Sequence, residues 1–300
     1  VLRFVPARRP AGGQRFDLLG ALLLFGSLMS LLLAMTIGQD GGFGQPSVLL
    51  LAAAWLVLLA AFLIVEWKSE QPMIDLRLFR NRLFNVNLIT GFATFVSMAG
   101  TIILIPFYLE NVMGYSPRAV GLLLAVVPIA VGITAPLSGA LSDRLGTRPI
   151  TVAGLAIMLL GFVAVSTLSL DTNAVGYVLR YLPVGIGIGI FQSPNNSAIM
   201  GAVPRERLGV ASSLLSITRS LGQTTGIAIL GAVWASRVAA RAGTVLAGGA
   251  TAAAPAAQVA GLNDTFRVVV GLLSVALFLA GLLWLQQLLD RPVRWRWRPV

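Results

Sequence analysis

Eight long, mainly apolar stretches recur along this chain, and they constrain its fold more than any other feature. An α-helix rises about 1.5 Å per residue, so about twenty residues cross a hydrocarbon core roughly 30 Å thick. Of the 300 residues, 57% are hydrophobic and 11% are charged, which is more apolar surface than a soluble domain can bury. We therefore predict an all-α polytopic membrane protein with eight transmembrane helices, at approximately 17–37, 47–65, 84–109, 120–141, 150–168, 175–202, 209–235 and 267–288.

The basic residues lie mostly on one side of these predicted helices. If the connecting segments alternate between two sides, one side holds sixteen Lys and Arg residues and the other holds three, at Arg118, Arg237 and Arg241. Cytoplasmic loops carry such an excess, so we expect both ends of the chain in the cytoplasm. The net charge of +11 is then a signal of topology, and we expect no nucleic-acid partner.

Several chemistries are excluded by the residues that the chain lacks. It has no cysteine and no histidine, so disulfides, thiolate sites and imidazole metal sites are absent, and we expect no metal and no cofactor. No Gly-x-Ser-x-Gly motif and no intramembrane carboxylate pair is present, so we do not expect an enzyme. The run Gly185-Ile-Gly187-Ile-Gly189 lies inside an apolar stretch without a preceding strand, which argues against a nucleotide loop.

A short charged turn joins the fourth and fifth predicted helices. It reads Gly139-Ala-Leu-Ser-Asp143-Arg144-Leu-Gly146-Thr-Arg148-Pro149. This turn resembles the Gly-x-Leu-x-Asp-Arg-x-Gly-x-Arg signature of the major facilitator superfamily, a family of secondary transporters. The resemblance implies that the glycines let two helices cross closely, and that the acid and the bases form a charge relay at a cytoplasmic gate. The gating residues would be Gly139, Asp143, Arg144, Gly146 and Arg148.

The turn departs from the signature at one position. Thr147 stands where a second base is usual, which weakens the cationic end of the implied relay. The alternative interpretation is a charged hairpin that only obeys membrane topology.

Further motifs resemble the fourteen-span drug/proton antiporter branch of that superfamily, which places two extra helices between two six-helix halves. They are Phe16-Asp17-Leu-Leu-Gly20, Pro72 to Arg82, Gly114-Tyr115-Ser116-Pro117 and Arg219-Ser-Leu-Gly222. The resemblance implies two linker helices plus one six-helix half of a major facilitator fold, the C-terminal portion of a longer transporter. A start of translation inside a longer reading frame is the other explanation for a first residue that is valine.

This arrangement predicts five segments. They are a cytoplasmic segment (1–16), two extra transmembrane helices (17–65), a cytoplasmic amphipathic linker (66–83), a six-helix transporter half (84–288) and a basic cytoplasmic tail (289–300). The linker is predicted as a short helix on the inner leaflet, because Met73, Leu76, Phe79 and Leu83 recur at helical spacing after Pro72. A plain basic linker is the alternative.

A polar stripe in the seventh predicted helix is a candidate transport pathway. Ser212, Ser216, Arg219, Gln223 and Gly226 follow a 4-3-4-3 spacing, which places them on one helical face. Arg219 lies roughly 16 Å from the cytoplasmic end of its helix, and a guanidinium at that depth needs a wet cavity or a counter-charge. A purely structural bond to a neighbouring helix is the alternative. Gly222 and Gly226 form a small-xxx-small pattern that favours close helix packing.

Amide side chains make the sixth predicted helix a second part of this candidate pathway. Gln192, Asn195 and Asn196 lie beside Pro194, and a broken helix with polar groups is typical of transporter pathways. Hydrogen bonding between helices is an equally good explanation. No acidic residue lies in the interior of a predicted helix, so we expect the proton-coupling carboxylate in the missing first half. Glu110 is the local candidate, and an ordinary interfacial role suits it better.

The resemblance implies a secondary transporter that exports drugs or other small lipophilic compounds by alternating access, driven by the proton gradient. We expect it in the bacterial plasma (inner) membrane as a multi-pass protein. Its expected partners are the lipid bilayer, a small-molecule substrate and the missing N-terminal half. An ion channel and a non-transporting membrane protein are the alternatives. Ala174-Val-Gly-Tyr177-Val178 is similar to a potassium-channel filter but lacks its last glycine.

Overall fold

The computed structural model describes residues 17–41, 43–69, 74, 76–242 and 249–289, and each regular element among them is helical. The α-helices are α1 (Leu18–Gly41), α2 (Pro46–Lys68), α3 (Arg82–Phe107), α4 (Pro117–Leu124), α5 (Val126–Leu145), α6 (Thr147–Val165), α7 (Ala174–Gly201), α8 (Leu208–Ala242) and α9 (Pro255–Leu289). Three 3₁₀ turns, η1 (Leu76–Arg80), η3 (Arg205–Arg207) and η4 (Ala250–Ala252), and one π-helical turn, η2 (Tyr108–Val112), complete the order.

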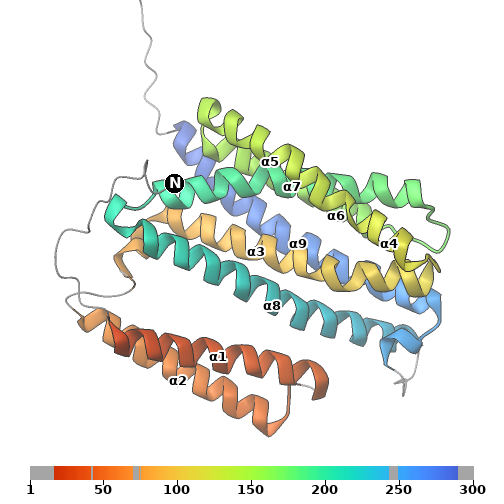
Figure 1. Cartoon of the computed structure of the whole chain (residues 1–300), viewed down its shortest axis with the longest axis horizontal. Coiled ribbons are helices and arrows are strands. Elements are labelled where there is room, and N and C mark those ends of the chain that lie inside the picture. Colours follow the sequence, from red (N-terminus) through yellow and green to blue (C-terminus); the bar gives the residue numbers. More distant parts are fainter. Residues whose placement is uncertain (1–16, 42, 70–73, 75, 243–248, 290–300) are drawn as a thin grey trace, which may run out of the picture.

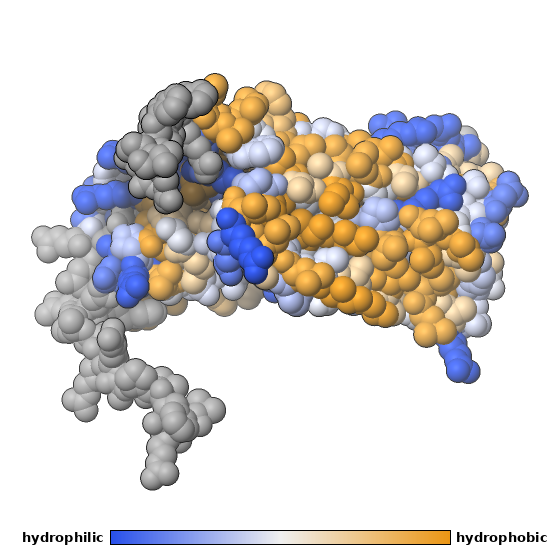
Figure 2. Space-filling model, turned by 90° about the horizontal axis from the view of Figure 1, so that it is seen from above, coloured by the Kyte–Doolittle hydropathy of each residue, from blue (hydrophilic) through white to orange (hydrophobic). Residues whose placement is uncertain are grey.

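The long helices lie side by side along the longest axis of the molecule, as Figure 1 shows. α1 and α2 form a hairpin at one edge, where α1 packs against α8. The other long helices form a bundle, in which α3 contacts α7, α8 and α9, and α7 contacts α5 and α6. Figure 2 shows extensive apolar surface between two more polar ends. Apolar side chains can face lipid there while the backbone is hydrogen-bonded within each helix, so this is an all-α membrane protein.

Seven of the described helical segments are long and apolar enough to cross a membrane. They are Leu18–Gly38, Pro46–Lys68, Arg82–Val112, Pro117–Leu145, Thr147–Val165, Ala174–Gly201 and Pro255–Leu289. The eighth predicted crossing, at 209–235, lies within α8, which has 35 residues. α8 has sufficient length, but its polar side chains lower its hydropathy, so its crossing stays a prediction.

The ends of several helices are fixed by residues that suit them. The Asn81 side chain accepts hydrogen bonds from the backbone N–H groups of Leu83 and Phe84, and Asn173 accepts one from Gly176, so each caps the N-terminus of its helix. Pro46 and Pro117 stand at first helical positions, where the missing N–H has no intrahelical partner to lose.

The glycine run of α7 is a packing device between two neighbouring helices. A Cβ added at Gly185 would lie 2.8 Å from Ala130 Cβ on α5, and one at Gly189 would lie 3.1 Å from Val131 Cα. A Cβ at Gly187 would instead lie 2.6 Å from the Met158 Cα on α6. Alternate glycines therefore serve opposite neighbours, and the run has the role of close helix packing.

The hairpin and the bundle differ in burial. In the most apolar stretch of the span Arg82–Val112, which contains α3, 67% of the residues are buried inside the protein. In the corresponding stretch of α2, 11% are buried. α3 is therefore the central helix of the bundle. Most of the α2 side chains point away from the rest of the chain, where lipid can cover them.

The amphipathic linker at 66–83 stays a prediction, because residues 70–73 and 75 lie outside the described part of the chain. In the described part, Glu66 to Lys68 belong to α2, Leu76–Arg80 forms a 3₁₀ turn, and Arg82 and Leu83 begin α3. The Ile74 N–H donates to Glu66 Oε2, and the Asn85 side chain donates to the Phe79 carbonyl. These bonds engage backbone groups that a continuous α-helix would use itself. The predicted segment 1–16, the predicted tail 289–300 beyond Leu289, and Pro72 and Met73 lie outside the described residues.

Candidate transport pathway and gate

The charged turn lies between α5 and α6, as predicted. Gly146 ends α5 with φ = 88°, a conformation that side chains rarely adopt, and its N–H donates to the Ser142 carbonyl at 2.8 Å. α6 begins at the next residue, so the turn reverses the chain within a single glycine. Gly139, one helical turn before Asp143, would place a Cβ 3.2 Å from Ser193 Oγ on α7. The first glycine therefore lies at a close crossing of α5 and α7.

The charges of the turn are not paired with one another. Asp143 and Arg144 are exposed, and in the described part of the chain neither forms an ion pair. Arg148 reaches the other way, and its Nη1 lies 3.5 Å from the Leu283 carbonyl near the end of α9. The carboxylate of Asp143 is therefore free to meet a partner beyond the described residues, while Arg148 faces α9.

The polar stripe of α8 lies largely on an exposed face of the helix. Ser212, Ser216 and Arg219 are exposed and Gln223 is half-buried. Gly226 does not belong to this face, because a Cβ there would lie 2.5 Å from the Val96 carbonyl oxygen of α3. Gly222 contacts α3 as well, with its Cβ position 2.7 Å from Phe95 Cβ. The small-xxx-small pair therefore packs against α3, as predicted, and the polar stripe ends at Gln223.

Arg219 is ordered by an aromatic ring on α3. Its guanidinium carbon lies 5.3 Å from the centroid of the Phe95 ring, within the range of a cation–π contact. Phe95 is 4% exposed. Within the described residues Arg219 has no acidic partner, so this cation in the first half of α8 rests on an aromatic ring with no carboxylate to neutralise it.

Asn195 on α7 faces α3 at Gly91, one helical turn before Phe95. Its Nδ2 would lie 3.3 Å from a Cβ added at Gly91, so the missing side chain leaves room for the amide. Asn195 is 2% exposed, and its Oδ1 has no hydrogen-bond partner in the part of the chain that is described. Gly91 and Phe95 are four residues apart and share one face of α3. Asn195 and Arg219 therefore approach that face of α3 from α7 and α8.

The other two amides are less closely involved. Gln192 and Asn196 are half-buried, and neither has a described side-chain hydrogen bond to α3 or α8. α7 is continuous from Ala174 to Gly201, so the expected break at Pro194 is wrong. The filter-like segment at Ala174–Val178 is the first helical turn of α7, which excludes an extended carbonyl filter there.

Two features of α3 were not predicted from the sequence. Phe95, the ring beneath Arg219, stands among apolar neighbours and has no pattern of its own. A buried row of hydroxyl side chains, at Thr90, Thr94, Ser97 and Thr101, each donates to a carbonyl three or four residues earlier. This row has the same 4-3-4 spacing as the stripe in α8, so its signal was present in the sequence.

The remaining candidates lie at the ends of the bundle. Glu110 is exposed on the π-helical turn η2, at the end of α3 opposite the charged turn. Among the described residues no group of three or more acidic, histidine or cysteine side chains could hold a metal ion.

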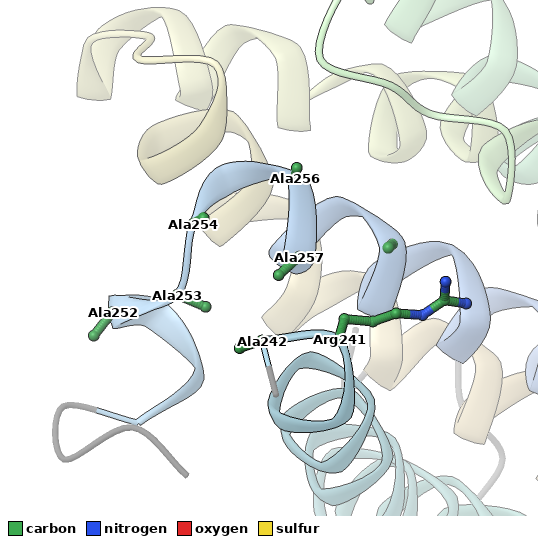
Figure 3. Close-up of a pocket in the computed structure, with 8 residues that line it drawn as sticks. Arg241, Ala242, Ala252, Ala253, Ala254, Ala256 and Ala257 are labelled. Atoms are coloured by element: carbon green, nitrogen blue, oxygen red, sulfur yellow. The ribbon is translucent and has the colours of Figure 1, made fainter. Parts of the chain in front are cut away.

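A cavity of about 550 Å³ lies between the end of α8, η4 and the start of α9. Apart from Arg241 the described residues that line it are alanines, several of which Figure 3 labels. The guanidinium of Arg241 is bound to Asp264 at 2.9 Å. With its one charge already engaged, this cavity offers little to select a ligand, and the polar face near Arg219 is the better candidate.

The fold and these polar residues define a helical membrane protein whose apolar bundle carries an exposed polar face on α8. Residues 16–227 match the family model of the Major Facilitator Superfamily. The chain belongs to the major facilitator superfamily, a family of transporters and not of enzymes, and it is homologous to multidrug efflux proteins.

Two relatives and one solved structure show how far the similarity extends. The chain is 31% identical to the multidrug transporter protein MdtP of Bacillus subtilis, over 79% of this chain and 44% of that protein. It is 34% identical to the multidrug resistance protein Stp of Mycobacterium tuberculosis, over 74% of this chain and 41% of Stp. The matched region thus spans less than half the length of these relatives.

A bacterial homologue of the human lysosomal transporter Spinster, in an inward-facing and occupied conformation, has a similar fold. Its TM-score is 0.55 at 18% identity, over 93% of this chain and 70% of that one. The likeness concerns the fold alone.

Proposed function

We propose that the chain is the C-terminal portion of a fourteen-span drug/proton antiporter, made of two linker helices (17–65) and a six-helix half (84–288). It exports drugs or other small lipophilic compounds by alternating access. The names of the relatives, a multidrug transporter and a multidrug resistance protein, support this substrate class. The fold supports a rocking motion of one half against another around a site near the midplane.

The observation that carries this proposal is the position of Arg219. Arg219 is the twelfth of the 35 residues of α8, its guanidinium rests on the Phe95 ring, and it has no acidic partner among the described residues. A cation held in this way in lipid would be costly, whereas in a water-filled pathway it can bind a substrate oxygen or a coupling carboxylate. Ser212 and Ser216 extend the same face towards the cytoplasmic end of α8, and Gln223 extends it towards the middle of the helix. Gln192, Asn195 and Asn196 form the α7 side of the pathway.

The charged turn then acts at the cytoplasmic gate. Asp143 is exposed and unpaired in the described structure, so it can bind a partner on the opposite half when the gate closes. Gly139 allows the close crossing of α5 and α7, and Gly146 forms the turn that follows Asp143. Arg144 and Arg148 supply the positive charge of the gate. The proton gradient supplies the energy, through a carboxylate outside this chain.

Replacement of Arg219 tests the pathway directly. Arg219→Lys keeps the positive charge but loses the planar fork, and Arg219→Gln loses the charge. We expect both variants to insert normally and to change the substrate profile or the pH dependence of efflux from whole cells. A loss of detergent thermostability together with an unchanged efflux profile would show that Arg219 only braces its neighbours.

The orientation is tested by single cysteines, because the chain has none of its own. We expect Arg205→Cys, in the basic loop before α8, to be protected from an impermeant maleimide in intact cells. We expect Asp171→Cys, in the loop between α6 and α7, to be labelled. Both side chains are exposed, so access to the reagent depends on the side of the membrane. The reverse pattern would contradict cytoplasmic chain ends.

A further inference from the structure

The α1–α2 hairpin contacts α8 on the face opposite the polar stripe. Thr225 Oγ1 lies 3.6 Å from Met35 Sδ on α1. Thr225 follows Gln223 by two residues, and Leu214 follows Ser212 by two, which is a rotation of about 200° around a helix. The hairpin therefore lies behind α8, away from Ser212, Ser216 and Arg219.

At the cytoplasmic end the hairpin is joined to the bundle by one apolar cluster, which we call the clasp. Phe62 of α2 and Ile74 are 3% and 6% exposed, although most of the hairpin is open. They belong to one contiguous set with side chains of α3, α7 and α8. The buried residues of the clasp are Phe62, Ile74, Phe84, Leu88, Ile199, Ala211 and Leu214.

Polar contacts close the end of the hairpin beside the clasp. Glu66 is 3% exposed and accepts the Ile74 N–H at 3.3 Å, which holds the segment after α2 against the end of that helix. Asp17 accepts the Gly20 N–H at 2.8 Å and so caps α1. A Cβ added at Gly20 would lie 3.2 Å from Glu66 Oε1 and 2.5 Å from Asp17 Oδ2. Gly20 therefore lets the first turn of α1 approach the end of α2.

A second tie connects the same segment to α7. The Asn81 side chain caps α3 and also donates to the Ala202 carbonyl at 3.3 Å, just beyond the end of α7. The segment between α2 and α3 is thus held by α2 on one side and by the cytoplasmic end of α7 on the other. The clasp ties the hairpin to α3, α7 and α8 at one end, and the contact of Met35 with Thr225 ties it to α8 again at mid-helix. These described contacts leave no point about which the hairpin could swing away from α8.

We propose that the hairpin is a brace for α8, which moves with the bundle as one body through the conformational cycle. The hairpin would not line the transport pathway. It would also not move together with the other six-helix half of the transporter. This inference concerns motion and not substrate, although the cycle itself rests on the proposed function. The clasp buries apolar surface at the cytoplasmic end of the hairpin. The movement of a gate at that end would otherwise separate the hairpin from the bundle.

A cross-link between the hairpin and α8 tests this proposal. This chain has no cysteine, so in the full-length transporter, with any cysteine of its other half replaced, we would introduce Met35→Cys with Thr225→Cys and join them with a short bis-maleimide in native membranes. We expect the same cross-linking rate with and without a proton gradient, and efflux of a fluorescent lipophilic dye unchanged after cross-linking. A rate that depends on the gradient, or a cross-link that stops efflux, would overturn the proposal.

A matched pair of substitutions tests the clasp without any transport assay. Phe62 is 3% exposed, whereas the next residue, Leu63, is 41% exposed. We expect Phe62→Ala to lower the Met35–Thr225 cross-linking rate roughly tenfold, because the cavity weakens the clasp and lets the hairpin separate. Leu63→Ala should leave that rate unchanged. Equal rates for the two variants would show that the clasp does not hold the hairpin, whether or not the protein exports drugs.

Discussion

α7 and α8 are neighbours in chain order, yet they meet their surroundings in opposite ways. α7 is enclosed, because Gly185, Gly187 and Gly189 bring it close to α5 on one side and to α6 on the other. α8 is close-packed along Gly222 and Gly226 and carries exposed polar side chains on an adjacent face. The glycine run of α7 is thus fixed by close packing, whereas α8 keeps polar side chains accessible beside its packed face. Substitutions in the glycine run should therefore lower stability, and those on the stripe of α8 should change transport.

The largest effect should come from Gly187→Val. The first added carbon would lie 2.6 Å from the Met158 Cα, so α6 and α7 would have to separate. Over-packing typically costs about 1–3 kcal/mol and sometimes more, and we expect a clear fall in detergent thermostability together with loss of efflux. Gly132→Val on α5 is the control, because nothing lies within 4 Å of its Cβ position. Equal stability of the two variants would remove the contrast between α7 and α8.

The next effect concerns the gate and should affect transport alone. Asp143→Asn keeps the volume of the side chain and removes its charge, and the exposed carboxylate supports no described contact within the bundle. We expect efflux to fall about tenfold, the scale of one lost charge-assisted hydrogen bond, with expression and thermostability unchanged. Asp171→Asn, an exposed acid in the loop between α6 and α7, should leave efflux unaltered. Undiminished efflux in Asp143→Asn would leave the turn as a topological hairpin.

A smaller effect is expected at the boundary between packing and pathway. Gly91→Ala would place a carbon 3.3 Å from Asn195 Nδ2, which is tight enough to move the amide by a few tenths of an ångström. Alanine also favours the helix by roughly 1 kcal/mol, so the net change in thermostability should be small. We expect an altered ranking of exported compounds in a growth-inhibition panel. An unchanged ranking would place Asn195 outside the pathway.

The smallest effect should come from the stripe itself. Ser216→Ala removes one exposed hydroxyl, and surface changes of this kind usually lie within about 0.5 kcal/mol. We expect unchanged thermostability and an efflux change of less than about threefold. Ser97→Ala is the comparison, since that hydroxyl is fully buried and donates to the Ala93 carbonyl at 2.7 Å. A greater loss of stability in Ser216→Ala than in Ser97→Ala would reverse the assignment of the two faces.

The positions of the helices could be predicted because the length of an apolar stretch is a property of the sequence alone. The charged turn could be predicted too, since Gly146 and its neighbours form a recognisable local pattern. Contacts between helices could not. Gly226 was assigned to the polar stripe because spacing shows which residues share a face but not where a neighbouring helix lies. Phe95 was missed because an aromatic residue in an apolar stretch is ordinary core until a cation is found above it.

The linker shows a different limit of prediction. Helical spacing from Met73 to Leu83 favoured an amphipathic helix, but spacing does not reveal competition for backbone groups. Glu66 accepts the Ile74 N–H, and Asn81 and Asn85 bond to backbone groups nearby. These side chains come from outside the periodic pattern, and they replace helical hydrogen bonds that the pattern alone would predict.

The π-helical turn at Tyr108–Val112 has a consequence for insertions and deletions. The Met113 N–H donates to the Tyr108 carbonyl five residues earlier, so this turn holds one residue more than an α-helical turn. Removal of one residue there should convert the turn into ordinary α-helix. The preceding residues of α3 would keep their orientation. The Tyr108 hydroxyl, which donates to the Ser169 carbonyl at 2.7 Å, would keep its place. A one-residue gap in homologous sequences is therefore best placed within this turn, and not among the residues of α3 that face Arg219.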